Sequence, residues 1–263
     1  MTVCIACLSN KSKAVVVASD RMITADFLAK QFEHKGTKIS VITEKIVALT
    51  AGSATRYLDI LRNTKSRLRT DAPNENLSEV IKIICEEYEK LRNIKIEEKF
   101  FKPMGIDRNG FYGEYVRRLP EEVASGLDEL VHNYDFGISL IIAGTDQTGA
   151  HIYDVSNPGT SECLDSIGYH SIGIGQSHSL LSLISSGAYP NDELLNTIYY
   201  VYEAKKKAEN APGVGSVTDM AAITAEGMRV FKQEDLDLLK ETYDKLNKPK
   251  KSNVLKLLKG LKI

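Results

Sequence analysis

Short apolar, β-branched segments occur in pairs along this chain, and a short polar turn separates the members of each pair. The first pair covers residues 2–8 and 14–19, and the second covers 37–43 and 45–50. Such pairs are typical of buried β-hairpins. Later strands are predicted over 136–143, 150–155, a segment ending near Ile172, 219–224 and 228–231.

Two helices are predicted after the first strands and two more after the central ones. Leucines at helical spacing predict one over 54–69, and Asn76 with Glu79 is similar to a capping box that begins the next. The later pair is expected over 176–186 and 192–209. Consecutive hairpins form antiparallel sheets, so this order favours an α+β fold of antiparallel sheets covered by helix pairs over a doubly wound parallel sheet.

The length of 263 residues fits one large domain. We expect this domain to cover 2–244, with an irregular, aromatic insertion at about 94–134 and a basic C-terminal tail over 245–263. Hydrophobic residues make up 43% and charged residues 26%, values typical of a globular chain with a buried core. The tail is expected to be a short amphipathic helix or a loose basic segment.

Charge and hydropathy weigh against several classes of partner. The formal net charge of −1 provides no long-range field that would attract nucleic acid or an anionic membrane. No apolar run approaches the ~20 residues that span a bilayer. The first residues lack the basic and long apolar regions of a secretory signal. We therefore expect a cytoplasmic protein with neither a nucleic-acid nor a membrane partner.

The cysteines and histidines show no metal-binding or disulfide pattern. Cys4, Cys7, Cys85 and Cys163 are too few and too scattered for a disulfide scaffold. Cys4 and Cys7 form a CxxC without a second metal-binding half, and on a strand residues i and i+3 point to opposite faces. We predict that both are small buried apolar side chains, and we expect no metal or organic cofactor.

Four motifs occur in a fixed order along most of the chain. They are VVVASDR at 15–21, HKGTKI at 34–39, LTAGS at 49–53, and LIIAGTD at 140–146 continuing to IYDV at 152–155, followed by Gly-Ile-Gly at 173–175. In this order they resemble the proteasome-like branch of the N-terminal nucleophile (Ntn) hydrolases, which includes the proteasome β-subunits. The resemblance implies a four-layer αββα sandwich of two antiparallel sheets between helix pairs.

The chemistry of such a site would centre on Thr2. Thr2 becomes the first residue if Met1 is removed, and removal is favoured when the next residue is small. Its hydroxyl would be the nucleophile and its own α-amine, with an ordinary pKa of ~7.7 to 8.0, the general base. The resemblance implies that Lys38 lowers the pKa of this amine and that Asp20 orients Lys38. It also implies that the Gly52 N–H stabilises the oxyanion.

Two auxiliary positions of the family match only in part. Ile174 is present where the family has a serine, and Ser177 is the nearest replacement. Glu209 is the candidate for the auxiliary acid before the last strand, whereas Pro212 occupies the approximate place of its serine. Lys35 is the alternative lysine, three residues before the preferred one.

These features predict a threonine-type peptidase or amide hydrolase that acts through an acyl-enzyme. The alternatives are a transpeptidase or small-amide hydrolase with the same nucleophile, Cys4 as nucleophile after loss of three residues, and a non-catalytic ring or scaffold subunit. Expected partners are a peptide or unfolded-protein substrate, further copies of the chain in a homo-oligomer such as a ring, and an ATP-dependent unfoldase. Phe111, Tyr112 or Tyr115 is expected to be partly buried between subunits, the alternative being that they pack under their own loop.

Overall fold

The structure is a computed structural model that describes residues 2–25, 30–33, 35–71 and 76–247. It is a mixed α+β fold with two five-stranded antiparallel sheets, which confirms the prediction of an α+β fold built on antiparallel sheets. Most of the predicted basic tail lies outside the described residues, as does Met1.

The first sheet contains the first and the last of the described strands. Its strands follow the order β10 (Tyr169–Ile172), β1 (Cys4–Ser9), β2 (Ala14–Asp20), β11 (Thr218–Thr224) and β12 (Gly227–Val230). The second sheet has the order β5 (Ile39–Thr43), β6 (Ile46–Gly52), β7 (Ile138–Thr145), β8 (Ala150–Ser156) and β9 (Thr160–Cys163). A separate hairpin of β3 (Met22–Ala25) and β4 (Lys30–Glu33) follows β2 directly.

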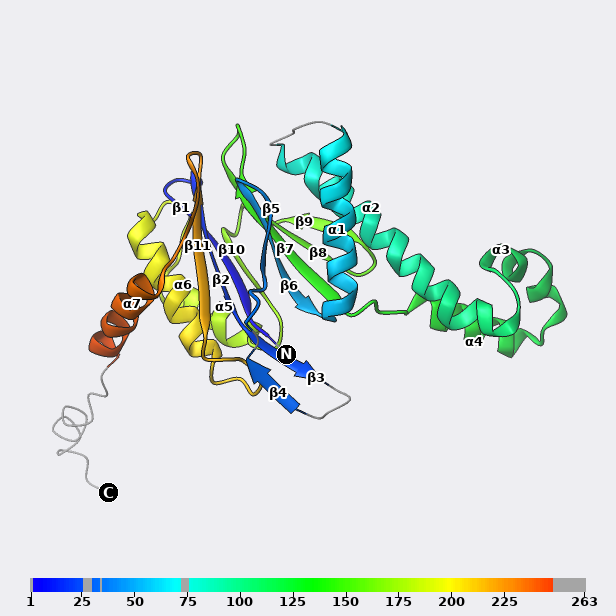
Figure 1. The fold of residues 1–263 in the computed structure, drawn as a ribbon. Helices are drawn as coiled ribbons and strands as arrows, with labels where there is room; N and C mark the ends of the chain where they lie inside the picture. Colours follow the sequence, from blue (N-terminus) through cyan, green and yellow to red (C-terminus); the bar gives the residue numbers. More distant parts are fainter. Residues whose placement is uncertain (1, 26–29, 34, 72–75, 248–263) are drawn as a thin grey trace, which may run out of the picture.

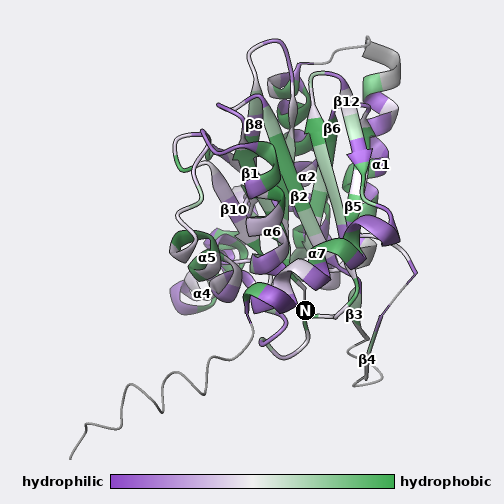
Figure 2. Ribbon diagram, turned by 90° about the vertical axis from the view of Figure 1, so that its left-hand side faces the viewer, coloured by the Kyte–Doolittle hydropathy of each residue, from purple (hydrophilic) through white to green (hydrophobic). Residues whose placement is uncertain are grey.

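The two sheets face each other and bury a shared apolar core. Cys4, Leu8 and Val17 from the first sheet lie in one cluster with Leu49 and Ile141 from the second. Alternate residues of β1 point the other way, toward helices, so the strand is buried on both faces. This double burial explains why its sequence is a continuous apolar run. Figure 2 shows the hydrophobic colouring concentrated on the strands.

Helix pairs cover the outer faces of both sheets. Helices α1 (Ala54–Asp71) and α2 (Leu77–Ile96) pack on the second sheet, while α5 (Gln176–Ser185) and α6 (Leu194–Ala208) pack on the first (Figure 1). A further helix, α7 (Gln233–Leu246), follows β12 and lies against α6. The molecule is therefore layered as helices, sheet, sheet and helices.

The two cysteines of the CxxC motif lie on opposite faces of β1, because side chains alternate between the two faces of a strand. Cys4 lies in the core between the sheets, whereas Cys7 lies under α5 and α6, and both are free and buried. The prediction of two buried apolar side chains on opposite faces is confirmed.

The insertion forms an arm that projects from the end of α2 (Figure 1). It consists of η2 (Glu97–Phe101), η3 (Lys102–Met104), α3 (Arg108–Gly110), η4 (Phe111–Tyr115), η5 (Val116–Arg118) and the returning α4 (Glu121–His132). Phe101 and Phe111 are fully buried in the arm, with ring centroids 5.4 Å apart. Phe111 therefore packs under its own loop, which for this residue is the alternative that the sequence analysis left open. Tyr112 is 43% exposed and remains available.

Candidate active site

The hairpin register of β1 and β2 places the beginning of the chain beside Asp20. Cys4 is paired with Ser19, and the Asp20 N–H donates to the Val3 carbonyl at 3.2 Å. Thr2 therefore lies at the end of β2, where the strand gives way to Arg21 and the β3–β4 hairpin.

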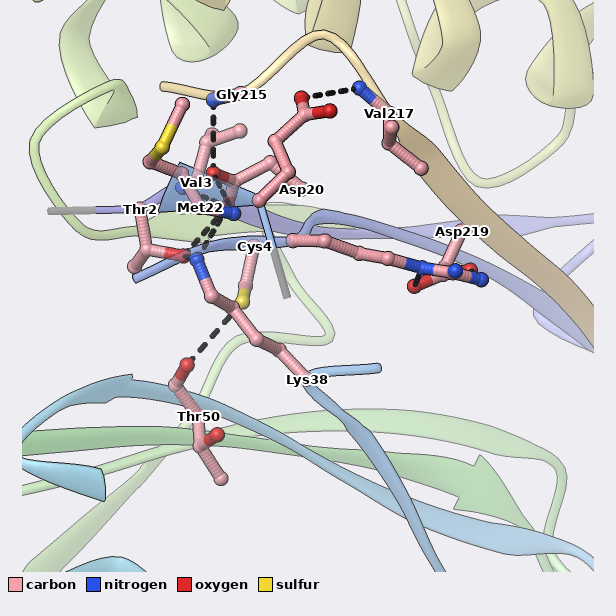
Figure 3. A network of polar contacts seen from close by, with 12 residues as sticks. Thr2, Val3, Cys4, Asp20, Met22, Lys38, Thr50, Gly215, Val217 and Asp219 are labelled. Atoms are coloured by element: carbon pink, nitrogen blue, oxygen red, sulfur yellow. Dashed lines mark hydrogen bonds and ion pairs between the residues drawn. The ribbon is translucent and has the colours of Figure 1, made fainter. Parts of the chain in front are cut away.

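Three polar side chains converge at this point, as Figure 3 shows. The Thr2 hydroxyl donates to Asp20 Oδ1 at 2.6 Å. Lys38 Nζ donates to the same oxygen at 2.7 Å and also to the Thr2 hydroxyl. Thr2 is 3% exposed, Asp20 is 0% exposed and Lys38 is 8% exposed. The structure thus brings three of the predicted site residues into mutual contact.

Asp20 accepts several hydrogen bonds, and these fix its carboxylate. Oδ1 also accepts the N–H of Val3 at 3.0 Å. Oδ2 accepts the N–H groups of Met22 at 3.0 Å and Gly215 at 2.9 Å. Burial by itself would raise the pKa of Asp20, but the charge of Lys38 and the hydrogen bonds from Lys38, Thr2 and Gly215 hold it below its ordinary value. Asp20 is therefore a carboxylate at neutral pH, and it compensates the buried lysine.

Lys38 reaches the site from the second sheet, where it directly precedes β5. A nearby contact also joins the sheets, since the Cys4 thiol donates to the Thr50 carbonyl at 3.5 Å. Burial raises the pKa of this thiol to about 12, an effect that the charge of Lys38 only partly offsets. Cys4 is therefore a neutral thiol, which argues against it as the nucleophile. Lys35 is exposed, and Lys38 is the lysine that contacts Thr2.

The Gly-Ile-Gly turn packs closely against the backbone of Thr2. The Gly175 N–H donates to the Thr2 carbonyl at 3.1 Å. Gly173 has φ +94°, and a Cβ there would lie 2.5 Å from Thr2 Cγ2. Glycine is required at this position by both its conformation and its neighbour. The turn offers no hydroxyl to the site, because its central residue is Ile174, whose side chain is exposed.

Ser177 does not occupy the auxiliary position that was expected of it. It is exposed on α5, and within the described part of the chain no hydrogen bond joins it to the three converging side chains. Two of the buried serines lie behind β1: the Ser179 hydroxyl donates to Ser171 at 2.7 Å, and the Ser171 hydroxyl donates to the Cys4 carbonyl at 3.0 Å. They support β1 through its backbone. No signal in the sequence distinguishes these serines from their neighbours.

Gly52 ends β6 with φ +104°. A Cβ there would lie 2.1 Å from the Gly137 carbonyl oxygen, so packing against the beginning of β7 already demands glycine. The oxyanion role of its N–H stays a prediction. Arg21 forms a two-point ion pair with Asp219, at 2.8 Å and 2.5 Å, which joins β2 to β11.

Glu209 lies at the end of α6 and contacts two lysines. Its oxygens accept from Lys205 at 2.6 Å and from Lys206 at 2.5 Å. In the described contacts Glu209 therefore does not touch Thr2. It is connected to the site only indirectly, through Lys205. Sequence analysis missed Lys205, which is fully buried.

No protein-family model matches the sequence, and no curated protein does either. In the described ranges, no group of three or more His, Cys, Asp or Glu side chains could hold a metal ion. None of the helices described above is long and apolar enough to cross a membrane.

Proposed function

We propose that the chain is an amide hydrolase of the N-terminal nucleophile type, with Thr2 as the nucleophile once Met1 has been removed. The observation that supports this most strongly is the contact of the Thr2 hydroxyl with both Asp20 and Lys38. A buried threonine in an ordinary structural role needs one hydrogen-bond partner for its hydroxyl, whereas the Thr2 hydroxyl contacts both members of a buried ion pair. An ion pair placed on a hydroxyl is an arrangement that activates a nucleophile.

The reaction begins with attack of the Thr2 oxygen on an amide carbonyl carbon. The hydroxyl proton passes to the free α-amine of the same residue, and a tetrahedral intermediate forms. When the C–N bond breaks, the leaving amine takes that proton and the acyl group stays on Thr2 as an ester. Water then attacks the ester, releasing a carboxylic acid and restoring the hydroxyl.

Lys38 and Asp20 would support this proton transfer electrostatically. The ammonium beside Thr2 favours the neutral form of the α-amine, which is the form that can accept a proton. Asp20 keeps the lysine in place and compensates its charge in a buried setting. In this proposal the Gly52 N–H stabilises the oxyanion of the tetrahedral intermediate.

The layered fold gives independent support. Two antiparallel sheets between helix pairs agree with the architecture that the resemblance to proteasome-like Ntn hydrolases implies. Within the same proposal the substrate is a peptide or unfolded protein, the chain forms a homo-oligomer, and an unfoldase delivers substrate. We propose that water, rather than an amine, attacks the acyl-enzyme. The two reactions are distinguished by adding an amine nucleophile and measuring whether the product is the free acid or the new amide.

A peptide β-lactone tests the proposed nucleophile. Ring opening by the Thr2 hydroxyl leaves an ester whose mass equals that of the protein plus the probe, and peptide mapping locates it. Thr2→Ala should take up no probe, and Thr2→Ser should take it up because its hydroxyl is retained. Labelling of Thr2→Ala at the wild-type rate would refute the proposal, and equal failure of the wild type and Thr2→Ser would also contradict it.

A further inference from the structure

Lys205 is a fully buried cation that the proposed reaction does not use. It lies on α6 between Ala204 and Lys206, and its exposed fraction is 0%, whereas Lys206 is partly exposed. All of its donor capacity is used. Nζ donates to Glu209 at 2.6 Å and to the carbonyl oxygens of Gly215 at 3.0 Å and Ser216 at 2.8 Å.

These carbonyls belong to the loop 209–217, which joins α6 to β11. The same Gly215 whose carbonyl accepts from Lys205 donates its N–H to Asp20 Oδ2 at 2.9 Å. One residue of the loop is therefore held between a buried lysine and the carboxylate of the site.

The other side of the loop is held by Glu33 on β4. Its Oε1 accepts from the Val217 N–H at 2.9 Å and from the Ser216 hydroxyl at 3.1 Å. A Cβ on Gly215 would lie 2.8 Å from Glu33 Oε1 and 3.2 Å from the Cβ of Met22. The loop thus has a cation on its carbonyl oxygens and an anion on its N–H and hydroxyl groups, and a side chain at Gly215 would crowd Glu33 and Met22.

We propose that Lys205 is a positioning residue, which holds the loop 209–217 so that the Gly215 amide stays on Asp20. The inference rests on the proposed function, in which Asp20 orients the lysine beside Thr2. In the described part of the chain Lys205 has no hydrogen bond to Thr2 or Lys38, so its influence on the site passes through the loop and through the attraction between its charge and that of Asp20. Its contact with Glu209 gives that acid an indirect link to the site.

Loss of this support has a definite electrostatic consequence. The Gly215 hydrogen bond is one of the interactions that lower the pKa of Asp20, so its loss should raise that pKa. The charged groups that face Lys205 are Glu209 and Lys206 on its own helix and Asp20 on β2, and Glu33 faces it across the loop. The control must therefore remove a charge from the same cluster while leaving the hydrogen bonds to the Gly215 and Ser216 carbonyl oxygens in place.

Lys206 provides that control, because it also contacts Glu209 at 2.5 Å and, among the described contacts, donates to no carbonyl oxygen of the loop. The experiment compares Lys205→Met with Lys206→Met in the full chain. Lys205→Gln serves as the conservative variant, since its amide can still donate to a carbonyl. Three quantities are measured: hydrogen exchange of the Gly215 amide, the carboxyl titration of Asp20 by ¹³C NMR, and the rate of β-lactone acylation.

For Lys205→Met we expect roughly tenfold faster exchange at Gly215, a titration midpoint of Asp20 at higher pH, and slower acylation. Lys206→Met should match the wild type, and Lys205→Gln should recover part of each change. If Lys205→Met proves unfolded, Lys205→Gln against Lys206→Met makes the same comparison.

Two results would separate this inference from the proposed function. Equal Gly215 exchange and equal Asp20 titration in the Lys205 variants and Lys206→Met would overturn the positioning role, even with acylation intact. No acylation of the wild type would contradict the proposed nucleophile, while faster exchange and a shifted titration would still support the contact made by Lys205.

Discussion

Lys38 and Asp20 form a buried ion pair at 2.7 Å whose two members come from different sheets. The carboxylate ends β2 of the first sheet, and the lysine precedes β5 of the second. Their contact therefore depends on how the two sheets are packed together. The Thr2 hydroxyl contacts both members of the pair, so the position of the proposed nucleophile also depends on this packing.

Removal of the proposed nucleophile should abolish activity and change stability only slightly. Thr2→Ala deletes a buried hydroxyl that donates to Asp20, and the net loss of one such hydrogen bond is about 1 kcal/mol of unfolding free energy. Acylation by the β-lactone should be abolished while thermal denaturation shifts by only a few degrees. Collapse of the fold in Thr2→Ala would show instead that the hydroxyl is mainly structural.

Removal of Lys38 should impair both the activity and the stability of the protein. Lys38→Met leaves a buried carboxylate without its cation, which typically costs about 3–5 kcal/mol of stability. Loss of its effect on proton transfer should slow acylation by roughly 10²-fold or more. Lys35→Met is the matched control, because Lys35 is exposed and should behave as the wild type. An inactive Lys35→Met beside a normal Lys38→Met would show that the wrong lysine has been assigned.

The stability of the fold should depend on acid pH through Asp20. Its pKa in the folded state is lower than in the unfolded chain, so the unfolded state binds a proton first as pH falls. The stabilisation is complete above the ordinary carboxyl pKa of ~3.9 and is lost as pH falls through the folded value. Chemical denaturation from pH 7 to pH 3 should show a weaker acid dependence in Asp20→Asn than in the wild type. Identical slopes would exclude Asp20 as a major contributor.

The elements that could be predicted are those with apolar periodicity. Most strands of both sheets and the four covering helices were expected near their observed positions, because one or both of their faces are buried. The strand β9 has four exposed residues, so it shows no apolar pattern. The hairpin of β3 and β4 was also missed. The helix α7 was missed as well, since none of its residues is buried.

The site could be predicted only in part for a related reason. Asp20 and Lys38 lie in motifs with a recognisable order and Thr2 directly follows Met1, whereas Lys205 lies in a run of three lysines. Its helical spacing from Val201 and Ala208 was an available signal, since it places Lys205 on the buried face of α6. Nothing in the sequence pairs Lys205 with Gly215, because that contact requires the loop to fold back over the helix.

Assembly can be tested on the arm. Tyr112 is 43% exposed and its hydroxyl donates to Asp128 at 2.5 Å, while Phe111 lies beneath it in the core of the arm. If the arm joins copies of the chain, Tyr112→Ser should weaken the homo-oligomer in light scattering without unfolding the protein. Phe111→Ala should instead destabilise the arm itself, by about 3–5 kcal/mol. A 29.1 kDa monomer at micromolar concentration would reject the oligomer, and an oligomer unaffected by deletion of 105–117 would reject the role of the arm.

Intact-mass analysis of the native protein, before and after treatment with the β-lactone, tests the central claim most directly. The proposed mechanism needs a free α-amine on Thr2, which an intact Met1–Thr2 peptide bond does not provide. We predict a mass that corresponds to loss of Met1, followed by addition of one probe per chain at Thr2. Quantitative retention of Met1 in protein that still takes up the probe, or an adduct on any other residue, would contradict the account.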